Sequence, residues 1–150
     1  MFERILCCVD GSQHALRAAE TACALAAKFG GQLTILTVAK ELKPSESVKR
    51  FMALEQLSGE PQYVLDEYTE EIVNKARDVA EASGLQGVKA EVRTGNPART
   101  IVEFAERHKA DCIVLGSRGI GDIGGVLLGS VSFKVNSLAK CTVVTVKPHD

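Results

Sequence analysis

The stretch that decides the fold is Gly116-Ser-Arg-Gly-Ile-Gly-Asp-Ile-Gly-Gly-Val-Leu-Leu-Gly-Ser130, which directly follows the short apolar run 112–115. Glycine occupies six of its fifteen positions. Because a glycine inside a helix or strand costs about 0.5–1 kcal/mol relative to alanine, this density predicts a loop whose backbone turns sharply or approaches another group closely. The apolar residues that follow are spaced three and four apart, which predicts a helix with Ser130 as its N-cap.

A strand, a glycine-rich loop and a helix N-terminus in this order predict an anion site, usually for phosphate. Unpaired amide N–H groups and the positive end of the helix dipole then point at one place. The Walker pattern is absent, since no lysine precedes a serine or threonine at the required position. The G-x-G-x-x-G match at Gly119, Gly121 and Gly124 neither opens a helix nor has the later acidic residue of a dinucleotide site, so we treat it as accidental.

The spacing that does fit is Gly116-x2-Gly119-x9-Gly129-Ser130. It resembles the nucleotide-binding signature of the ATP-binding universal stress proteins. Other motifs resemble the same family in the right order: the first strand and turn over 5–12, the Gly-x-Pro turn at 95–97, the helix start at 128–132 and the last strand from 141. The resemblance covers nearly the whole chain, and it implies that residues 1–150 form a single universal stress protein domain.

Hydrophobic patterning predicts strands that alternate with helices along the chain. The expected strands are 3–9, 33–39, 88–93, 112–115 and 141–147, and the expected helices are 13–29, 62–82, 97–108 and one from 130 onward. This alternation predicts an α/β fold, a doubly wound parallel sheet of five strands with helices on both faces. The family resemblance implies the strand order 3-2-1-4-5. Residues 40–62 are expected to be a connection with a short helix over 48–57, either a lid or a solvated linker.

In that order the winding reverses between the first and fourth strands, and ligands of such sheets bind at the carboxyl ends of these two strands. Asp10 and Gly116 follow those ends. We expect Gly116 and Gly119 to approach ribose and phosphate closely, and Gly129 with Ser130 to donate amide and hydroxyl hydrogen bonds to the phosphates. Further candidates at the start of the helix are Val131 and Ser132.

The family resemblance implies that Asp10 lies near the nucleoside and that Val38 presents its backbone to the adenine edge. The residues expected to line the same cleft are Cys8, Val9, Ala39 and Leu115. Asp10 can instead be a turn former at the start of the first helix. Arg118 either neutralises phosphate or is solvated, and Asp122 either repels a triphosphate or helps to hold a divalent ion on it.

Composition narrows the classes of partner. The formal net charge is −1 and the pI is near 6.3, so we expect neither nucleic acid nor anionic lipid as a partner. The five cysteines are odd in number and lie mostly in apolar runs, which indicates core residues in a reducing compartment. Because no apolar run approaches 18 residues, membrane insertion is not expected and a cytoplasmic location is predicted.

Together these patterns predict an ATP-binding universal stress protein, a small cytoplasmic regulatory or sensor module that binds ATP with Mg²⁺. The last strand, Cys141 to Val146, is an apolar sheet edge without proline or charge, and it predicts a homodimer through that edge. The alternative is a slow ATPase or phosphotransfer enzyme at the same site, for which Arg118 is available but no clear base is. An interaction module without nucleotide is disfavoured by the glycine signature.

Overall fold

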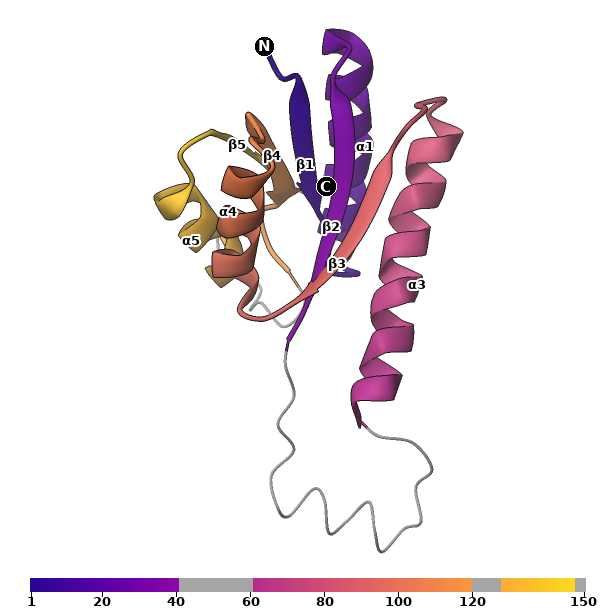
Figure 1. The fold of residues 1–150 in the computed structure, drawn as a ribbon, viewed down its shortest axis with the longest axis vertical. Coiled ribbons are helices and arrows are strands. Elements are labelled where there is room, and N and C mark those ends of the chain that lie inside the picture. The colour runs from indigo at the N-terminus through magenta and orange to yellow at the C-terminus, as the bar shows by residue number, and fades with distance from the viewer. Residues whose placement is uncertain (41–60, 120–127, 148–150) are drawn as a thin grey trace, which may run out of the picture.

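A computed structural model describes residues 1–40, 61–119 and 128–147. Its elements are β1 (Arg4–Cys8), α1 (Gln13–Phe29), β2 (Gln32–Ala39), α3 (Pro61–Ala82), β3 (Lys89–Thr94), α4 (Pro97–Arg107), β4 (Cys112–Gly116), α5 (Ser130–Leu138) and β5 (Thr142–Val146). The strands form one sheet in the order β3-β2-β1-β4-β5, and every pair is parallel (Figure 1). The predicted doubly wound α/β sheet is therefore confirmed. The helix expected over 48–57 and the role of Asp122 lie outside the described residues.

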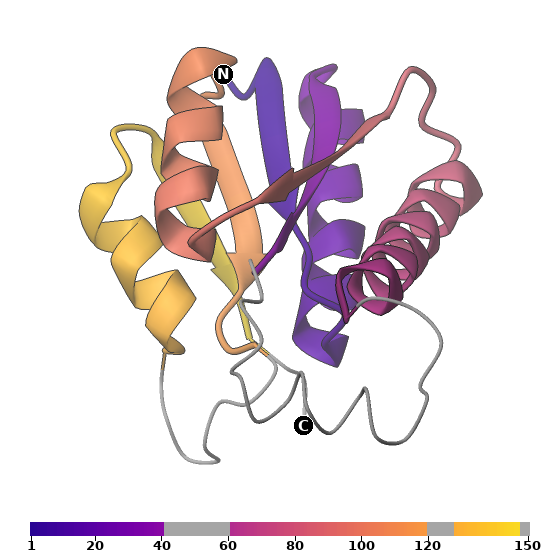
Figure 2. The ribbon, with the colours of Figure 1, turned by 60° about the horizontal axis from the view of Figure 1, so that its bottom comes forward.

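The helices cover both faces of the sheet, with α1 and α3 on one face and α4 and α5 on the other (Figure 2). Successive side chains of β1 point to opposite faces: Ile5 and Cys7 join the core under α1 and α3, whereas Leu6 and Cys8 join the core under α4. A central strand that is buried on both faces needs an apolar side chain at nearly every position. This requirement explains the continuous apolar runs of β1 and β4.

Local signals in the sequence fix both ends of α1 and the start of α4. The hydroxyl oxygen of Ser12 accepts a hydrogen bond from the Ala15 N–H (3.1 Å), and Gly30 ends α1 in the left-handed conformation with φ 66°. The Asn96 side chain accepts from the Arg99 N–H (3.1 Å), with proline in the first turn of α4. Serine and asparagine before a helix, proline in its first turn and glycine after its end are the residue types typical of these positions.

The start of α5 differs from the prediction, because its N-cap is Gly129 and not Ser130. The Gly129 carbonyl already accepts the Phe133 N–H (2.9 Å), so helical bonding begins one residue earlier than expected. No side chain caps this end, and Ser130 is the first residue of the helix. Gly129 is extended (φ −70°, ψ 166°), so it is not at this position to supply a positive φ.

The cysteines are free thiols with different surroundings. Cys7, Cys8, Cys23 and Cys112 are buried, whereas Cys141 is half-buried. Burial, with smaller contributions from Cys141 and Asp111, raises the pKa of the Cys112 thiol to about 11. The four buried side chains therefore act as small apolar core residues. Across the part of the chain that the structure describes, we find no helix with the length and apolar character that crossing a membrane requires.

Candidate functional site

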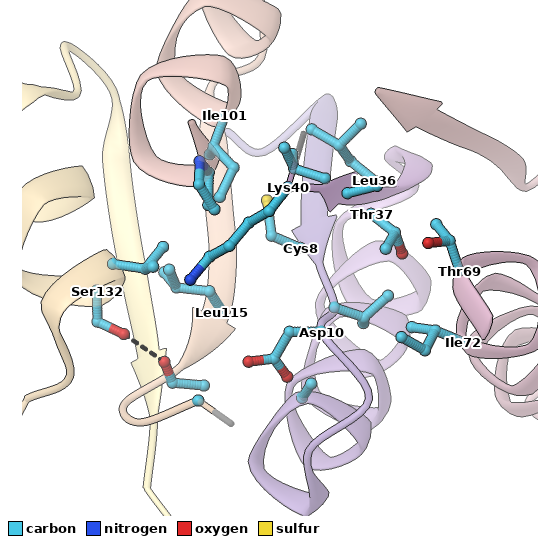
Figure 3. A pocket seen from close by; sticks show the side chains of 18 of the residues that line it. Cys8, Asp10, Leu36, Thr37, Lys40, Thr69, Ile72, Ile101, Leu115 and Ser132 are labelled. Atoms are coloured by element: carbon cyan, nitrogen blue, oxygen red, sulfur yellow. Dashed lines mark hydrogen bonds between the residues drawn. The ribbon is translucent and has the colours of Figure 1, made fainter. Parts of the chain in front are cut away.

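A cavity of about 330 Å³ lies at the carboxyl ends of β1, β2 and β4, where the winding of the sheet reverses (Figure 3). It brings together twelve of the thirteen predicted site residues: Cys8, Val9, Asp10, Val38, Ala39, Leu115, Gly116, Arg118, Gly119, Ser130, Val131 and Ser132. Gly129 is not among the lining residues, although it directly precedes Ser130. Residues from separate parts of the sequence thus share one concave surface of a size suited to a small molecule.

The carboxyl end of β4 is held close to the first turn of α1. A Cβ atom placed on Gly116 would lie 2.7 Å from the Cβ of His14 and 3.0 Å from its backbone carbon. Both distances are shorter than ordinary carbon contacts. Glycine is therefore required at position 116 by helix packing, whereas from the sequence we expected only a close approach of ribose and phosphate there.

Three hydrogen bonds join the end of β4 to the start of α5 and to β5. The buried Ser132 hydroxyl donates to the Gly116 carbonyl (2.6 Å). The Ser117 N–H donates to the Val146 carbonyl (2.9 Å), and the Ser117 carbonyl accepts from the Gly129 N–H (2.6 Å). Because its proton is engaged with Gly116, Ser132 positions the helix start and is not placed as a hydroxyl donor to a ligand.

Asp10 combines a structural contact with a place in the cavity wall. Its Oδ1 accepts the Ser12 N–H (2.9 Å), an Asx turn that leads into α1. Its carboxylate also points into the cavity between the β4 side and the α3 side (Figure 3). The turn-forming role is thus present, and it is compatible with a role toward a ligand.

Nine residues of the wall were not predicted from the sequence: Ala15, Leu36, Thr37, Lys40, Tyr68, Thr69, Ile72, Pro97 and Ile101. Tyr68 and Ile72 belong to an apolar stripe of α3, and the sequence does not show that this part of the helix faces a cavity. Lys40 directly follows β2, and its side chain reaches across the cavity toward Leu115 and Ser132 (Figure 3). Its place two residues after Val38, the residue expected at the adenine edge, is the sequence signal that could have identified it.

Comparison with known proteins places the chain in a family. The model of the universal stress protein family matches residues 1–147. The chain belongs to the universal stress protein family. This universal stress protein is 37% identical over 151 residues to "Universal stress protein in QAH/OAS sulfhydrylase 3'region" of Thermus aquaticus, a match that covers 98% of this chain and 100% of the relative.

Solved structures agree with the fold of this universal stress protein. The hypothetical protein MJ0577 has a TM-score of 0.74 and 26% identity, with 100% of this chain and 99% of that chain covered. A universal stress protein solved in complex with cAMP has a TM-score of 0.67 and 28% identity, with 96% of each chain covered.

The described residues bring few charged groups to the cavity of this universal stress protein. These are Asp10, Lys40 and Arg118. Burial raises the pKa of the Cys8 thiol, and the nearby Cys141 raises it further, so Cys8 is a neutral thiol and not a nucleophilic thiolate. Within the described ranges, no three His, Cys, Asp or Glu side chains are grouped as a metal site.

Proposed function

We propose that this cavity binds ATP, and that the protein is a small cytoplasmic regulatory or sensor module whose state follows nucleotide occupancy. The observation that carries the proposal is the start of α5, where Ser130 and Val131 line the cavity and no side chain caps the helix. The first N–H groups of an uncapped helix need acceptors, and phosphate oxygens supply them. The first turn of α5 also contains no acidic residue that would repel an anion.

The proposed nucleotide lies across the cavity from α5 toward the end of β2. Figure 3 displays Ser132 on one side, Asp10 between, and Thr37 with Ile72 on the other side. With the phosphates at α5, the ribose falls near Asp10 and the base near β2. The solved relative in complex with cAMP supports a nucleotide as the class of ligand.

The backbone of β2 is suited to bond the edge of a base. The Leu36 carbonyl accepts the Val9 N–H (3.0 Å), which is the last backbone bond from β1 to β2 among the described residues. Val38 lies two residues further, so its peptide groups turn to the same side, beyond the end of β1. There they can pair with the donor and acceptor groups of adenine.

Two cations of the wall, Lys40 and Arg118, balance the charge of the phosphates in this arrangement. Mg²⁺ would be bound mainly by the phosphates and water, since this ion needs only one or two protein carboxylates. Asp10 is the carboxylate of the described wall.

Calorimetric titration with Mg²⁺-ATP tests the proposal. Saturable binding with a stoichiometry of one nucleotide per chain is expected, and AMP and cAMP are the competitors that define which phosphates matter. If neither ATP, AMP nor cAMP at millimolar concentration gives a binding heat, the assignment of this cavity to a nucleotide is overturned.

Bound ATP is expected to be turned over slowly or not at all. Phosphoryl transfer needs a positioned nucleophile as well as charge neutralisation. Among the described residues of the wall, the carboxylate available as a base is Asp10, and its Oδ1 is engaged with the Ser12 N–H. Phosphate release is measured with excess Mg²⁺-ATP. Turnover of about 1 per second, the lower end of the range for kinases, would favour the enzyme hypothesis instead.

We also propose a homodimer through the outer edge of β5, since β5 is one of the two end strands of the described sheet and contains no charged residue or proline. The Val146 carbonyl accepts the N–H of Ser117, the residue after β4, so by alternation the peptide groups of Thr145 point outward. A Thr145→Pro variant removes one outward N–H and leaves the β4 ladder intact. Sedimentation equilibrium should show a wild-type dimer and a weakened one for this variant. A wild-type monomer at micromolar concentration would contradict the proposal.

A further inference from the structure

Thr37 carries a buried hydroxyl group in the wall of the cavity. Its side chain is 3% exposed, and its Oγ1 has no hydrogen-bond partner among the described residues. A buried hydroxyl without a partner is unfavourable, whereas valine has nearly the same shape and an equal preference for strands. Packing alone therefore does not explain a threonine at this position of β2.

The surroundings of Thr37 define which chemical group the hydroxyl can serve. In Figure 3 it points toward Thr69 of α3, which is 4% exposed, and both residues line the cavity. The same wall also contains apolar side chains, and Val9 and Ile72 among them are buried. A phosphate would lose its hydration here without a counter-charge, so the group that fits is neutral and forms hydrogen bonds.

The position of Thr37 within the cavity identifies the part of the ligand. The hydroxyl lies across the cavity from Ser132 and the start of α5, with Asp10 between (Figure 3). In a nucleotide whose phosphates lie at α5, the group furthest from them is the base. Threonine both donates and accepts, so it can bond a ring nitrogen or an exocyclic group of a base.

We propose that the Thr37 hydroxyl is a specificity-determining group that forms a hydrogen bond with the nucleobase. This inference rests on the proposed nucleotide-binding function, and it identifies a side chain that recognises the base. It implies that the site favours nucleosides whose base presents a polar atom toward β2.

The test compares Thr37→Val, Thr37→Ser and Thr34→Val by calorimetric titration with ATP and with adenosine. Thr34 lies on the same strand outside the cavity, so it controls for a threonine-to-valine change in β2. Thr37→Val should weaken ATP and adenosine by the same factor, roughly 2- to 12-fold, which corresponds to one hydrogen bond. Thr37→Ser should retain most of the affinity, and Thr34→Val all of it.

Thermal melts of the ligand-free proteins separate recognition from a structural role. Thr37→Val should melt at the wild-type temperature or above, since it removes an unpartnered buried hydroxyl. A lower melting temperature would assign the hydroxyl to the fold and overturn the inference. If Thr37→Val does not fold, the affinities of Thr37→Ala and Thr37→Ser for ATP and adenosine are compared in the same titrations.

Two binding results would overturn the inference while leaving nucleotide binding intact. In the first, Thr37→Val binds both ligands as the wild type does, so the hydroxyl contacts only water. In the second, ATP is weakened but adenosine is not, so the hydroxyl serves the phosphates. Wild-type protein that binds neither ATP nor adenosine would instead remove the proposed function, and this inference with it.

Discussion

Wild-type protein is expected to gain about 2.7 kcal/mol of unfolding free energy when ATP is present at 100 times its dissociation constant, and a Gly129→Val variant is expected to gain none. Gly129 is buried, and it directly precedes the amide groups of α5 that we propose hold the phosphates. Its extended backbone suits valine, so the variant adds bulk without a φ penalty. We therefore expect the added bulk to disturb the start of α5, on which the proposed phosphate binding depends. Thermal melts with and without Mg²⁺-ATP measure it.

A matched control lies at the other end of the same helix. Ser137 is exposed, and its hydroxyl donates only to the Phe133 carbonyl of its own helix (2.9 Å). Ser137→Val should therefore keep the full ATP-dependent stabilisation. An equal ATP-dependent shift in wild type and Gly129→Val would show that the start of α5 is not the phosphate site.

Gly116→Ala is expected to lower the unfolding free energy by about 1–3 kcal/mol in the absence of any nucleotide, the usual cost of overpacking a tight site. The added Cβ would lie 2.7 Å from the His14 Cβ and 3.1 Å from its carbonyl oxygen, and these atoms belong to the first turn of α1. The first turn of α1 would have to move as a unit to remove this overlap. Each kcal/mol lowers the melting temperature of a chain of this length by roughly 2–4 °C.

Gly84→Ala separates crowding from backbone conformation. Gly84 has a positive φ of 83°, but nothing lies within 4 Å of the place that an alanine Cβ would take, so its variant carries only the conformational cost. A Gly116→Ala variant as stable as wild type would mean that α1 moves freely against β4. The close packing described at this end of the sheet would then be wrong.

Much of the fold could be predicted because its signals are local. Ser12, Gly30 and Asn96 act within a few residues of their own positions, and the structure places each where the pattern requires it. The order of the strands could not be predicted in this way, because pairing between distant segments leaves no local signal in the sequence. We took the order from the resemblance to the universal stress protein family, and the parallel strand pairs of the sheet agree with it.

The candidate site was predicted unevenly for the same reason. Glycine spacing and the apolar strand ends identified the β1, β4 and α5 walls, which are short segments with strong patterns. The α3 wall was missed, because Ile72 and Thr69 lie on a helix whose face toward the cavity depends on how it packs against β2. Thr37 was missed because a threonine in a strand is ordinary, and only its buried environment makes its hydroxyl unusual.

The backbone hydrogen bonds of Ser117 have a consequence for the proposed regulatory role. Ser117 bonds to the start of α5 through its carbonyl and to the end of β5 through its N–H, so a ligand that fixes α5 also restrains this end strand of the described sheet. If that strand pairs with a second copy, the two equilibria share a coupling free energy, and such coupling is reciprocal. The apparent affinity for nucleotide would then depend on protein concentration. At a fixed nucleotide level, the fraction of sites occupied would therefore change with the abundance of the protein.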